Sequence, residues 1–134
     1  MSKTKQEIDT FLKQIRIGFL GTLNKDGSPN SMPLWYEWDG EKIRMFSSVD
    51  TGKVRRLKND ARATLSVADG VGAMEDWVTV EGTVKILSEG GGELACKLAA
   101  LYYDAERGKK TIDIWSKKTD WVLLELTPTK IRAM

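Results

Sequence analysis

Residues 46–57 read Phe-Ser-Ser-Val-Asp-Thr-Gly-Lys-Val-Arg-Arg-Leu and join two kinds of local structure. The stretch begins with a short run of strand character. After Gly52 the spacing becomes helical, because Val54 and Leu57 lie one turn apart with basic residues around them. The sequence therefore predicts a strand that leads directly into a short basic helix.

The turn between this strand and helix collects groups that bind anions. The first amides of a helix are unpaired and lie at the positive end of the helix dipole, and Lys53 adds a full charge beside them. Ser47 and Thr51 add hydroxyl groups. The alternative is that Asp50 or Thr51 only caps the helix and that the basic residues form a solvated face. The stretch alone leaves both interpretations open.

Short strands separated by turn residues account for much of the remaining chain. Asn24 to Gly27 and Asp39-Gly40 are turn sequences that join antiparallel neighbours, so the first three strands are predicted to form a meander. The expected strands are residues 16–23, 31–38, 42–48, 61–68, 77–87 and 121–126. This pattern is typical of a small antiparallel barrel, and the length fits a single domain, residues 1–134.

Helical spacing is confined to short segments. Apolar residues between Ile8 and Ile15 predict a leading amphipathic helix. A second helix is predicted after the three glycines at 90–92, with an apolar stripe of Leu94, Leu98 and Leu101. Residues 104–118 are polar apart from three apolar side chains, and we expect them to be irregular. The helices would cap the barrel rather than connect parallel strands.

The composition argues against several classes of function. The 21 Lys and Arg nearly balance the 19 Asp and Glu, so the net charge predicts no nucleic-acid or membrane partner. The chain has no histidine and one cysteine, Cys96, which removes an internal disulfide, most metal sites and Ser-His or Cys-His catalysis. The first residues lack a signal-peptide core and no apolar run could cross a bilayer, so we expect a cytoplasmic protein without a metal site.

Several short motifs follow one another in an order and spacing that identify a family. They are Gly21-Thr22-Leu23, Asp26-Gly27-Ser28-Pro29, Pro33, Asp39-Gly40, Phe46-Ser47-Ser48, Thr51-Gly52-Lys53, Leu57, Asp60-Ala61-Arg62, Val80-Glu81-Gly82 and Leu126-Thr127-Pro128. Through them the chain resembles the pyridoxamine phosphate oxidase-like, flavin-binding split β-barrel family over nearly its whole length. The resemblance implies a mainly β fold: a six-stranded antiparallel split β-barrel of the Greek-key type with a few short capping α-helices.

The resemblance also implies which residues bind phosphate. Ser47 falls where the oxidases use a threonine near the flavin phosphate, and Lys53 matches their phosphate-binding lysine. Other cations of the oxidases are absent, because Gly52 and Met32 stand where they carry arginines and Glu37 where they carry a substrate-binding lysine. A buried phosphate dianion must be paired with cations. We therefore expect a substrate other than pyridoxamine phosphate.

The implied cofactor is FMN, with a deazaflavin coenzyme as the alternative. A Gly-Lys pair together with Pro33 and Trp35 is similar to the branch that includes deazaflavin-dependent reductases. The resemblance implies that the backbone of residues 33–36 follows the polar edge of the ring system. Trp77 occupies a position at which, in the oxidases, the residue approaches the cofactor from its subunit. For Trp35, Trp77 and Trp115, packing in the core or a dimer is the alternative role. The implied cofactor-binding residues are Ser47, Ser48, Thr51, Gly52, Lys53, Pro33, Leu34, Trp35, Phe46 and Trp77.

The family is dimeric with cofactors between the subunits, so the resemblance implies a homodimer. The expected function is an FMN-dependent oxidoreductase that acts on an unidentified small organic substrate. No side chain is predicted to be catalytic, since the cofactor carries the redox chemistry. The alternatives are a deazaflavin-dependent reductase, a non-enzymatic stress protein that binds a flavin or a tetrapyrrole, and an empty barrel used as an interaction module.

Overall fold

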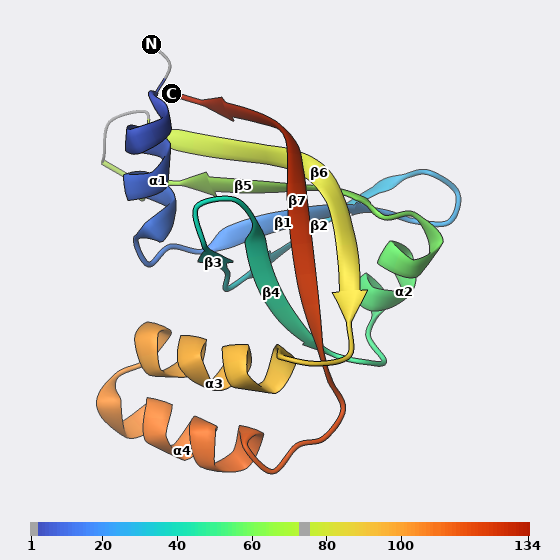
Figure 1. The fold of residues 1–134 in the computed structure, drawn as a ribbon, viewed down its shortest axis with the longest axis vertical. Coiled ribbons are helices and arrows are strands. Elements are labelled where there is room, and N and C mark those ends of the chain that lie inside the picture. The colour runs from blue at the N-terminus through green and yellow to red at the C-terminus, as the bar shows by residue number, and fades with distance from the viewer. Residues whose placement is uncertain (1–2, 73–75) are drawn as a thin grey trace.

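The computed structural model of the chain describes residues 3–72 and 76–134. Its strands form one curled sheet, and helices lie around its margins (Figure 1). The strands are β1 (Gly18–Leu23), β2 (Pro29–Leu34), β3 (Glu37–Trp38), β4 (Ile43–Ser48), β5 (Arg62–Ala68), β6 (Trp77–Leu87) and β7 (Trp121–Ala133). The helices are α1 (Lys5–Lys13), α2 (Gly52–Asn59), α3 (Gly91–Tyr102) and α4 (Ala105–Trp115). The predicted class, a mainly β split barrel with capping helices, is confirmed.

The sheet has the strand order β2-β1-β5-β6-β7-β4-β3, and every pairing in it is antiparallel. It contains seven strands where six were predicted, because the expected strand 31–38 is divided. Its first part, β2, pairs with β1 at one edge, and its last part, β3, pairs with β4 at the other edge. The chain crosses between the two edges through Trp35 and Tyr36. Both predicted turns therefore join antiparallel strands, but the prediction of one continuous three-strand meander is wrong.

The interior is filled by one face of the strands. In β4, β5 and β6 buried side chains alternate with more exposed ones, as expected for a sheet with one face on the core. The helices α1 and α2 cover this core with Phe11, Leu12, Val54 and Leu57, each at most 4% exposed. No helix within the described ranges is long and apolar enough to span a membrane.

The last strand is longer than predicted. We expected it to end at Leu126, but β7 continues through Pro128 to Ala133. A register shift in β6 beside Gly82 lets the strand pass this proline, which cannot donate a ladder hydrogen bond. A Cβ atom on Gly82 would collide with the Thr127 carbonyl oxygen, so the close approach requires glycine.

Residues 104–118, expected to be irregular, contain α4, and that prediction is wrong. The Asp104 side chain caps the helix by accepting a hydrogen bond from the Arg107 amide at 2.9 Å. Gly108 is buried against the Ala99 carbonyl oxygen of α3, which lets the two helices pack closely. The predicted stripe of α3 is right for Leu94 and Leu98, which are buried, whereas Leu101 is 53% exposed. The pair α3–α4 lies at one end of the barrel (Figure 1).

Candidate functional site

The predicted strand-to-helix turn lies between β4 and α2. Strand β4 ends at Ser48, Thr51 is the N-cap, and α2 begins at Gly52. The Val54 amide donates to the Thr51 hydroxyl at 3.5 Å, so the capping interpretation of Thr51 is confirmed. Capping leaves other amides of the first turn without an intrahelical partner. The cap therefore orients the helix start and does not remove its capacity for an anion.

Hydroxyl groups behind the helix start are locked into one network. Ser47 is 3% exposed, and its hydroxyl donates to the Ser48 carbonyl oxygen at 2.8 Å. With its proton used there, Ser47 Oγ accepts from the Thr51 hydroxyl at 2.8 Å and from Lys53 Nζ at 3.4 Å. Ser47 thus holds the Lys53 ammonium, and Thr51 holds the Ser47 hydroxyl.

Lys53 is a partly buried cation. Among the described residues its ammonium contacts the Ser47 hydroxyl and takes part in no ion pair, so further N–H groups remain for a ligand. Burial lowers the pKa of Lys53, and the neighbouring Arg56 charge lowers the pKa further. Both causes disfavour the charged ammonium form. A bound anion would favour that form and raise the pKa of Lys53 again.

Arg56 is the second cation at this place and was not predicted. It is partly buried, and its Nε donates to the Thr22 hydroxyl of β1 at 2.8 Å. In the part of the chain that the structure describes it forms no ion pair, whereas the adjacent Arg55 is exposed and pairs with Asp50 at 2.7 Å. The sequence signal was the spacing of Lys53 and Arg56, which three residues apart share one helix face.

A pocket of about 220 Å³ opens beside the Lys53 ammonium. Residues from β2, the crossing segment, β4, α2 and the α3–α4 pair line it: Met32, Pro33, Leu34, Trp35, Phe46, Lys53, Tyr103 and Trp115. One end of the pocket is therefore cationic and the rest is largely apolar and aromatic. A planar ring system that carries an anionic group matches this distribution.

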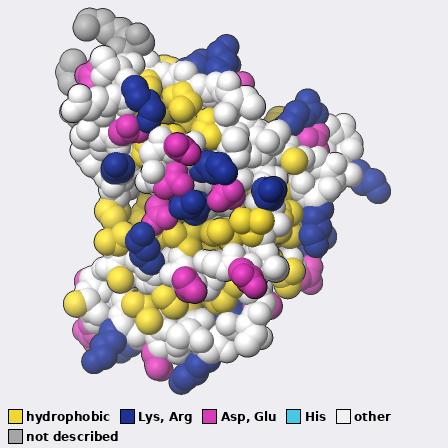
Figure 2. All heavy atoms as spheres, in the orientation of Figure 1, with side chains coloured by type: hydrophobic (Ala, Val, Ile, Leu, Met, Phe, Trp, Pro, Cys, Tyr) yellow, Lys and Arg dark blue, Asp and Glu magenta, His cyan; other side chains and the backbone are white. Residues whose placement is uncertain are grey.

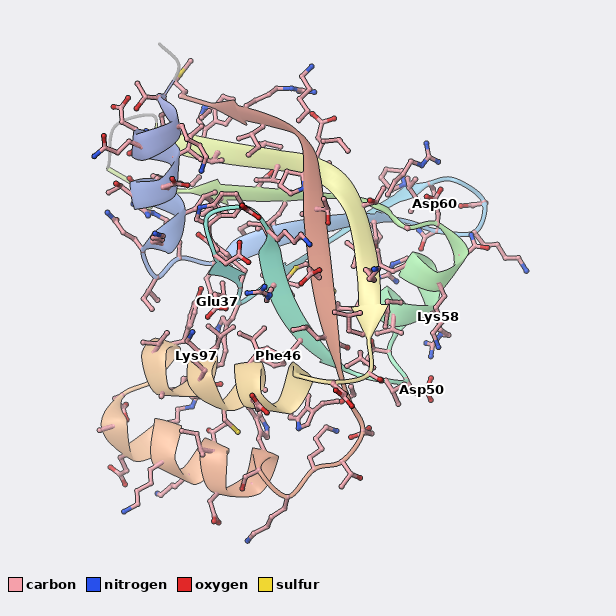
Figure 3. All side chains as sticks on the ribbon, viewed as in Figure 1. Glu37, Phe46, Asp50, Lys58, Asp60 and Lys97 are labelled. Carbon is pink, nitrogen blue, oxygen red and sulfur yellow. The ribbon has the colours of Figure 1, made fainter. Side chains whose placement is uncertain are left out.

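The aromatic wall of the pocket is built around Trp35. Its ring stacks on Tyr102 at a centroid distance of 4.8 Å and meets Tyr103 edge-on at 4.7 Å. Phe46 and Trp115 contact each other at 5.5 Å and both contact Trp35. Figure 3 shows Phe46 between β4 and α3. Trp115 is the last residue of α4, and the packing of this helix brings its ring to the wall. Its position could not be predicted, because residues 104–118 were expected to be irregular.

The ten predicted cofactor-binding residues fall into three groups. Five line the pocket: Pro33, Leu34, Trp35, Phe46 and Lys53. Four form the turn and hydroxyl network around it: Ser47, Ser48, Thr51 and Gly52. Trp77 lies elsewhere, at the start of β6 opposite Ala68, and its backbone pairs with Met134. The structure therefore gathers nine of these residues and leaves Trp77 outside the pocket of its own chain.

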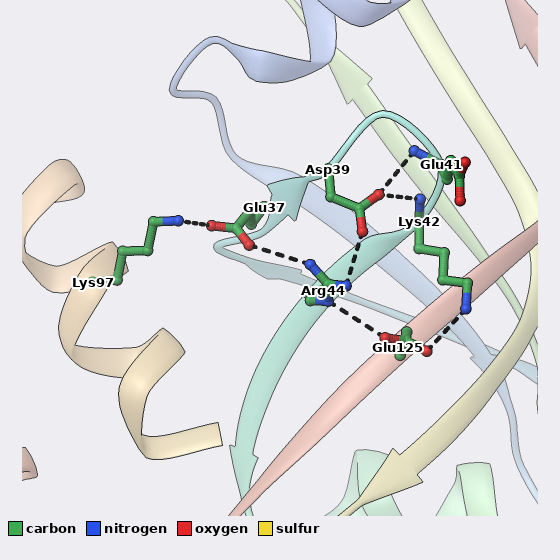
Figure 4. A network of polar contacts seen from close by, with 7 residues as sticks. All are labelled: Glu37, Asp39, Glu41, Lys42, Arg44, Lys97 and Glu125. Carbon is green, nitrogen blue, oxygen red and sulfur yellow. Dashed lines mark hydrogen bonds and ion pairs between the residues drawn. The ribbon is translucent and has the colours of Figure 1, made fainter. Parts of the chain in front are cut away.

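Glu37, the position of a substrate-binding lysine in the oxidases, belongs to an ion-pair network (Figures 3 and 4). It pairs with Lys97 of α3 and with Arg44 at 3.8 Å. Arg44 also reaches Asp39 at 2.9 Å and Glu125 at 3.4 Å. Figure 2 shows acidic and basic side chains intermingled on this face. The network ties α3 to β3, β4 and β7, so its charges serve the packing of these elements.

A larger hollow of about 560 Å³ lies across β1, β5 and β6. The charged residues in its lining are Arg62 and Glu81, which pair with Asp60 and Arg132. Thr22, which accepts the hydrogen bond from Arg56, also lines this hollow, whereas Lys53 lines the smaller pocket. The described residues contain no group of three or more His, Cys, Asp or Glu placed to hold a metal ion.

The fold is that of a split-barrel protein, and a partly buried lysine lies at its strand-to-helix turn. The family profile described as pyridoxamine 5'-phosphate oxidase matches residues 4–134, and the chain belongs to this family. No curated protein sequence gave a match.

Solved structures share the fold at low sequence identity. An F420 reductase is 23% identical, with 92% of this chain and 94% of that chain covered and a TM-score of 0.66. An FAD-binding protein from Mesorhizobium loti is 23% identical, with 99% and 93% covered and a TM-score of 0.68. General Stress Protein 26 from Bacillus anthracis is 17% identical, with 97% and 92% covered and a TM-score of 0.71.

Proposed function

We propose that this chain is an FMN-binding oxidoreductase that acts on a small organic substrate. The observation that carries the proposal is that Lys53, which has no carboxylate partner among the described residues, lines an aromatic-walled pocket at the start of a helix. The phosphate would contact Lys53 and the amides at the start of α2. The ring system would lie along residues 33–35 against Trp35 and Phe46.

The residues present fit such a group. Lys53 is partly desolvated without a counter-charge in the described chain, which is unfavourable unless an anion binds. The buried Ser47 hydroxyl fixes the ammonium in place. The pocket supplies apolar surface for the ring and cationic surface for the phosphate from adjoining elements.

The side chains that line the pocket indicate which part of the reaction the protein would carry out and which part the cofactor would. A bound flavin supplies the redox chemistry, and the protein orients it and shields one face. The described pocket lining contains neither histidine nor carboxylate, and we assign no catalytic acid or base. Glu37 is engaged by Lys97 and Arg44, which supports a substrate other than pyridoxamine phosphate.

A deazaflavin coenzyme is the second candidate for the same pocket. It also carries a phosphate, so Lys53 would serve it equally. The similar fold of the F420 reductase supports this candidate. The stress-protein alternative, binding without turnover, draws similar support from General Stress Protein 26.

The direct test is the spectrum of the purified protein. We expect flavin absorption and fluorescence, and FMN in the mass spectrum of the material released by heat. Release of a deazaflavin would select the second candidate. A colourless protein that ignores added FMN, deazaflavin and tetrapyrrole would refute the proposal.

We further propose a homodimer with the cofactor between the subunits. The pocket of one chain, about 220 Å³, is smaller than the roughly 300 Å³ at which small-molecule sites usually begin. Beside it, Phe19 is 50% exposed and lies opposite the exposed Pro33 in the β1–β2 pair. A second copy covering this patch would complete the pocket, and its Trp77 would become available to the cofactor.

Size-exclusion chromatography with light scattering tests this assembly. We expect a dimer at micromolar concentration for the wild type. Phe19→Lys should yield a folded monomer with weaker FMN binding, because the half-exposed ring contributes little to the core of one chain. A wild-type monomer that binds FMN fully would remove the interface site.

A further inference from the structure

We propose that Arg56 supplies the second cation of the phosphate site by folding back onto the first turn of α2. This inference rests on the proposed phosphate site and adds a residue that recognises the ligand. A phosphate monoester carries up to two negative charges, and Lys53 offers one positive charge. The site therefore calls for a second donor with a full charge.

The geometry of Gly52 shows where the Arg56 guanidinium lies. A Cβ atom built on Gly52 would be 3.1 Å from Arg56 Nη1, so the guanidinium occupies the space in which a side chain at position 52 would begin. Glycine at the first position of α2 leaves this space open. The guanidinium thus lies beside the unpaired amides of the helix start and on the same side as Lys53.

Thr22 holds the guanidinium there. Its side chain is 3% exposed, and its hydroxyl accepts the Arg56 Nε hydrogen at 2.8 Å. Arginine has five N–H donors, and in the described part of the chain the Nε hydrogen is the one that has a partner. The Nη groups therefore remain for a phosphate. Arg56 also lowers the pKa of Lys53, which places the two positive charges within electrostatic reach.

Arg55 provides a matched control. It is the adjacent arginine on the same helix, but it is exposed and its guanidinium pairs with Asp50 at 2.7 Å. Removing either arginine changes the net charge by the same amount. A difference between the two variants therefore reports position and not overall charge.

The test compares FMN with riboflavin, which has the same ring system without the phosphate. Fluorescence titrations of the full chain are made with wild type, Arg56→Gln and Arg55→Gln. We expect Arg56→Gln to weaken FMN binding about tenfold or more, as for a lost charge-assisted hydrogen bond, with riboflavin binding unchanged. Arg55→Gln should stay within about twofold of wild type.

A charge-relocation variant makes the test reciprocal. In Gly52→Arg/Arg56→Gln the positive charge is moved to position 52, where the oxidases carry an arginine. The new side chain begins in the space that the Arg56 guanidinium vacates. We expect FMN affinity to recover toward the wild-type value. A double variant as weak as Arg56→Gln would contradict the exchange of the two positions.

These titrations separate the role of Arg56 from the existence of the flavin site. Equal FMN affinity in Arg56→Gln and Arg55→Gln, or a parallel loss of riboflavin binding, overturns the role of Arg56 while the flavin site stands. A wild type that binds neither ligand refutes the flavin site itself, and the role of Arg56 with it.

Discussion

Two groups of charged side chains in this molecule differ in how their charges are satisfied. In the network of Glu37, Arg44 and Lys97, each charge faces an opposite charge of the same chain (Figure 4). At the start of α2, Lys53 and Arg56 contact hydroxyl groups, and no described carboxylate pairs with them. Partly buried charges that lack counter-charges are costly unless a ligand supplies them. The first group therefore accounts for packing, and the second is the place where we propose that an anionic ligand binds.

The largest expected effect is at Lys53. Lys53→Ala should weaken FMN binding by about 1 to 3 kcal/mol, because it removes an ammonium paired with the phosphate. Isothermal titration measures the loss, and Lys58→Ala on the exposed side of α2 is the control. Unchanged FMN affinity in Lys53→Ala would place the phosphate elsewhere and erase the contrast between the two groups.

A smaller effect should appear at alkaline pH. Burial and the Arg56 charge lower the pKa of Lys53, so in the free protein the ammonium loses its proton at a lower pH than an exposed lysine would. FMN binding should weaken as the pH rises through this lowered pKa, and riboflavin titrations correct for ionisation of the ring. Lys53→Arg keeps its charge and should abolish this phosphate-specific loss; a variant with the same pH profile as wild type would contradict the assignment.

A variant of Arg44 tests the network of Glu37, Arg44 and Lys97, in which each charge is paired. Arg44→Met should lower the free energy of unfolding by about 1 kcal/mol, since it removes several partly exposed ion pairs that link β3, β4 and β7. FMN affinity should not change. Urea unfolding and FMN titration measure the two quantities, and a loss of binding with no loss of stability would move this network into the site.

The smallest expected effect is at Lys97. Its side chain is 61% exposed, so Lys97→Ala should change the free energy of unfolding by less than about 0.5 kcal/mol. FMN affinity should again be unchanged. A strong loss of FMN binding in Lys97→Ala would show that Glu37 faces the ligand and not only its ion-pair partners.

Much of the fold could be predicted because its signals are local. The alternation in residues 77–87 and the Asn24 to Gly27 turn each depend on neighbouring residues, and β6 and the β1–β2 pair are observed. The division of residues 31–38 could not be predicted, because it depends on how the whole sheet curls. Helix α4 was missed because its Asp104 cap and the Gly108 contact act on a segment with few apolar residues.

The site was predictable where one short stretch encodes it. Ser47, Thr51 and Lys53 lie within seven residues and meet as expected. Arg56 was not among the predicted binding residues, since only the folded chain brings Thr22 of β1 beside it. Trp115 and Tyr103 likewise reach the pocket through the packing of α3 and α4. Contacts between distant segments, rather than residue types, account for these omissions.

We propose that the start of α2 binds the phosphate of a flavin, and the ratio of the riboflavin to the FMN dissociation constant measures what the phosphate contributes to binding. We expect a ratio of at least about fifty for the wild type, since the losses expected at Lys53 and Arg56 multiply, and a much smaller ratio for Lys53→Ala/Arg56→Gln, in which only the amides of the helix start remain for the phosphate. A wild-type ratio close to one would contradict it, because the two cations would then contribute nothing to recognition.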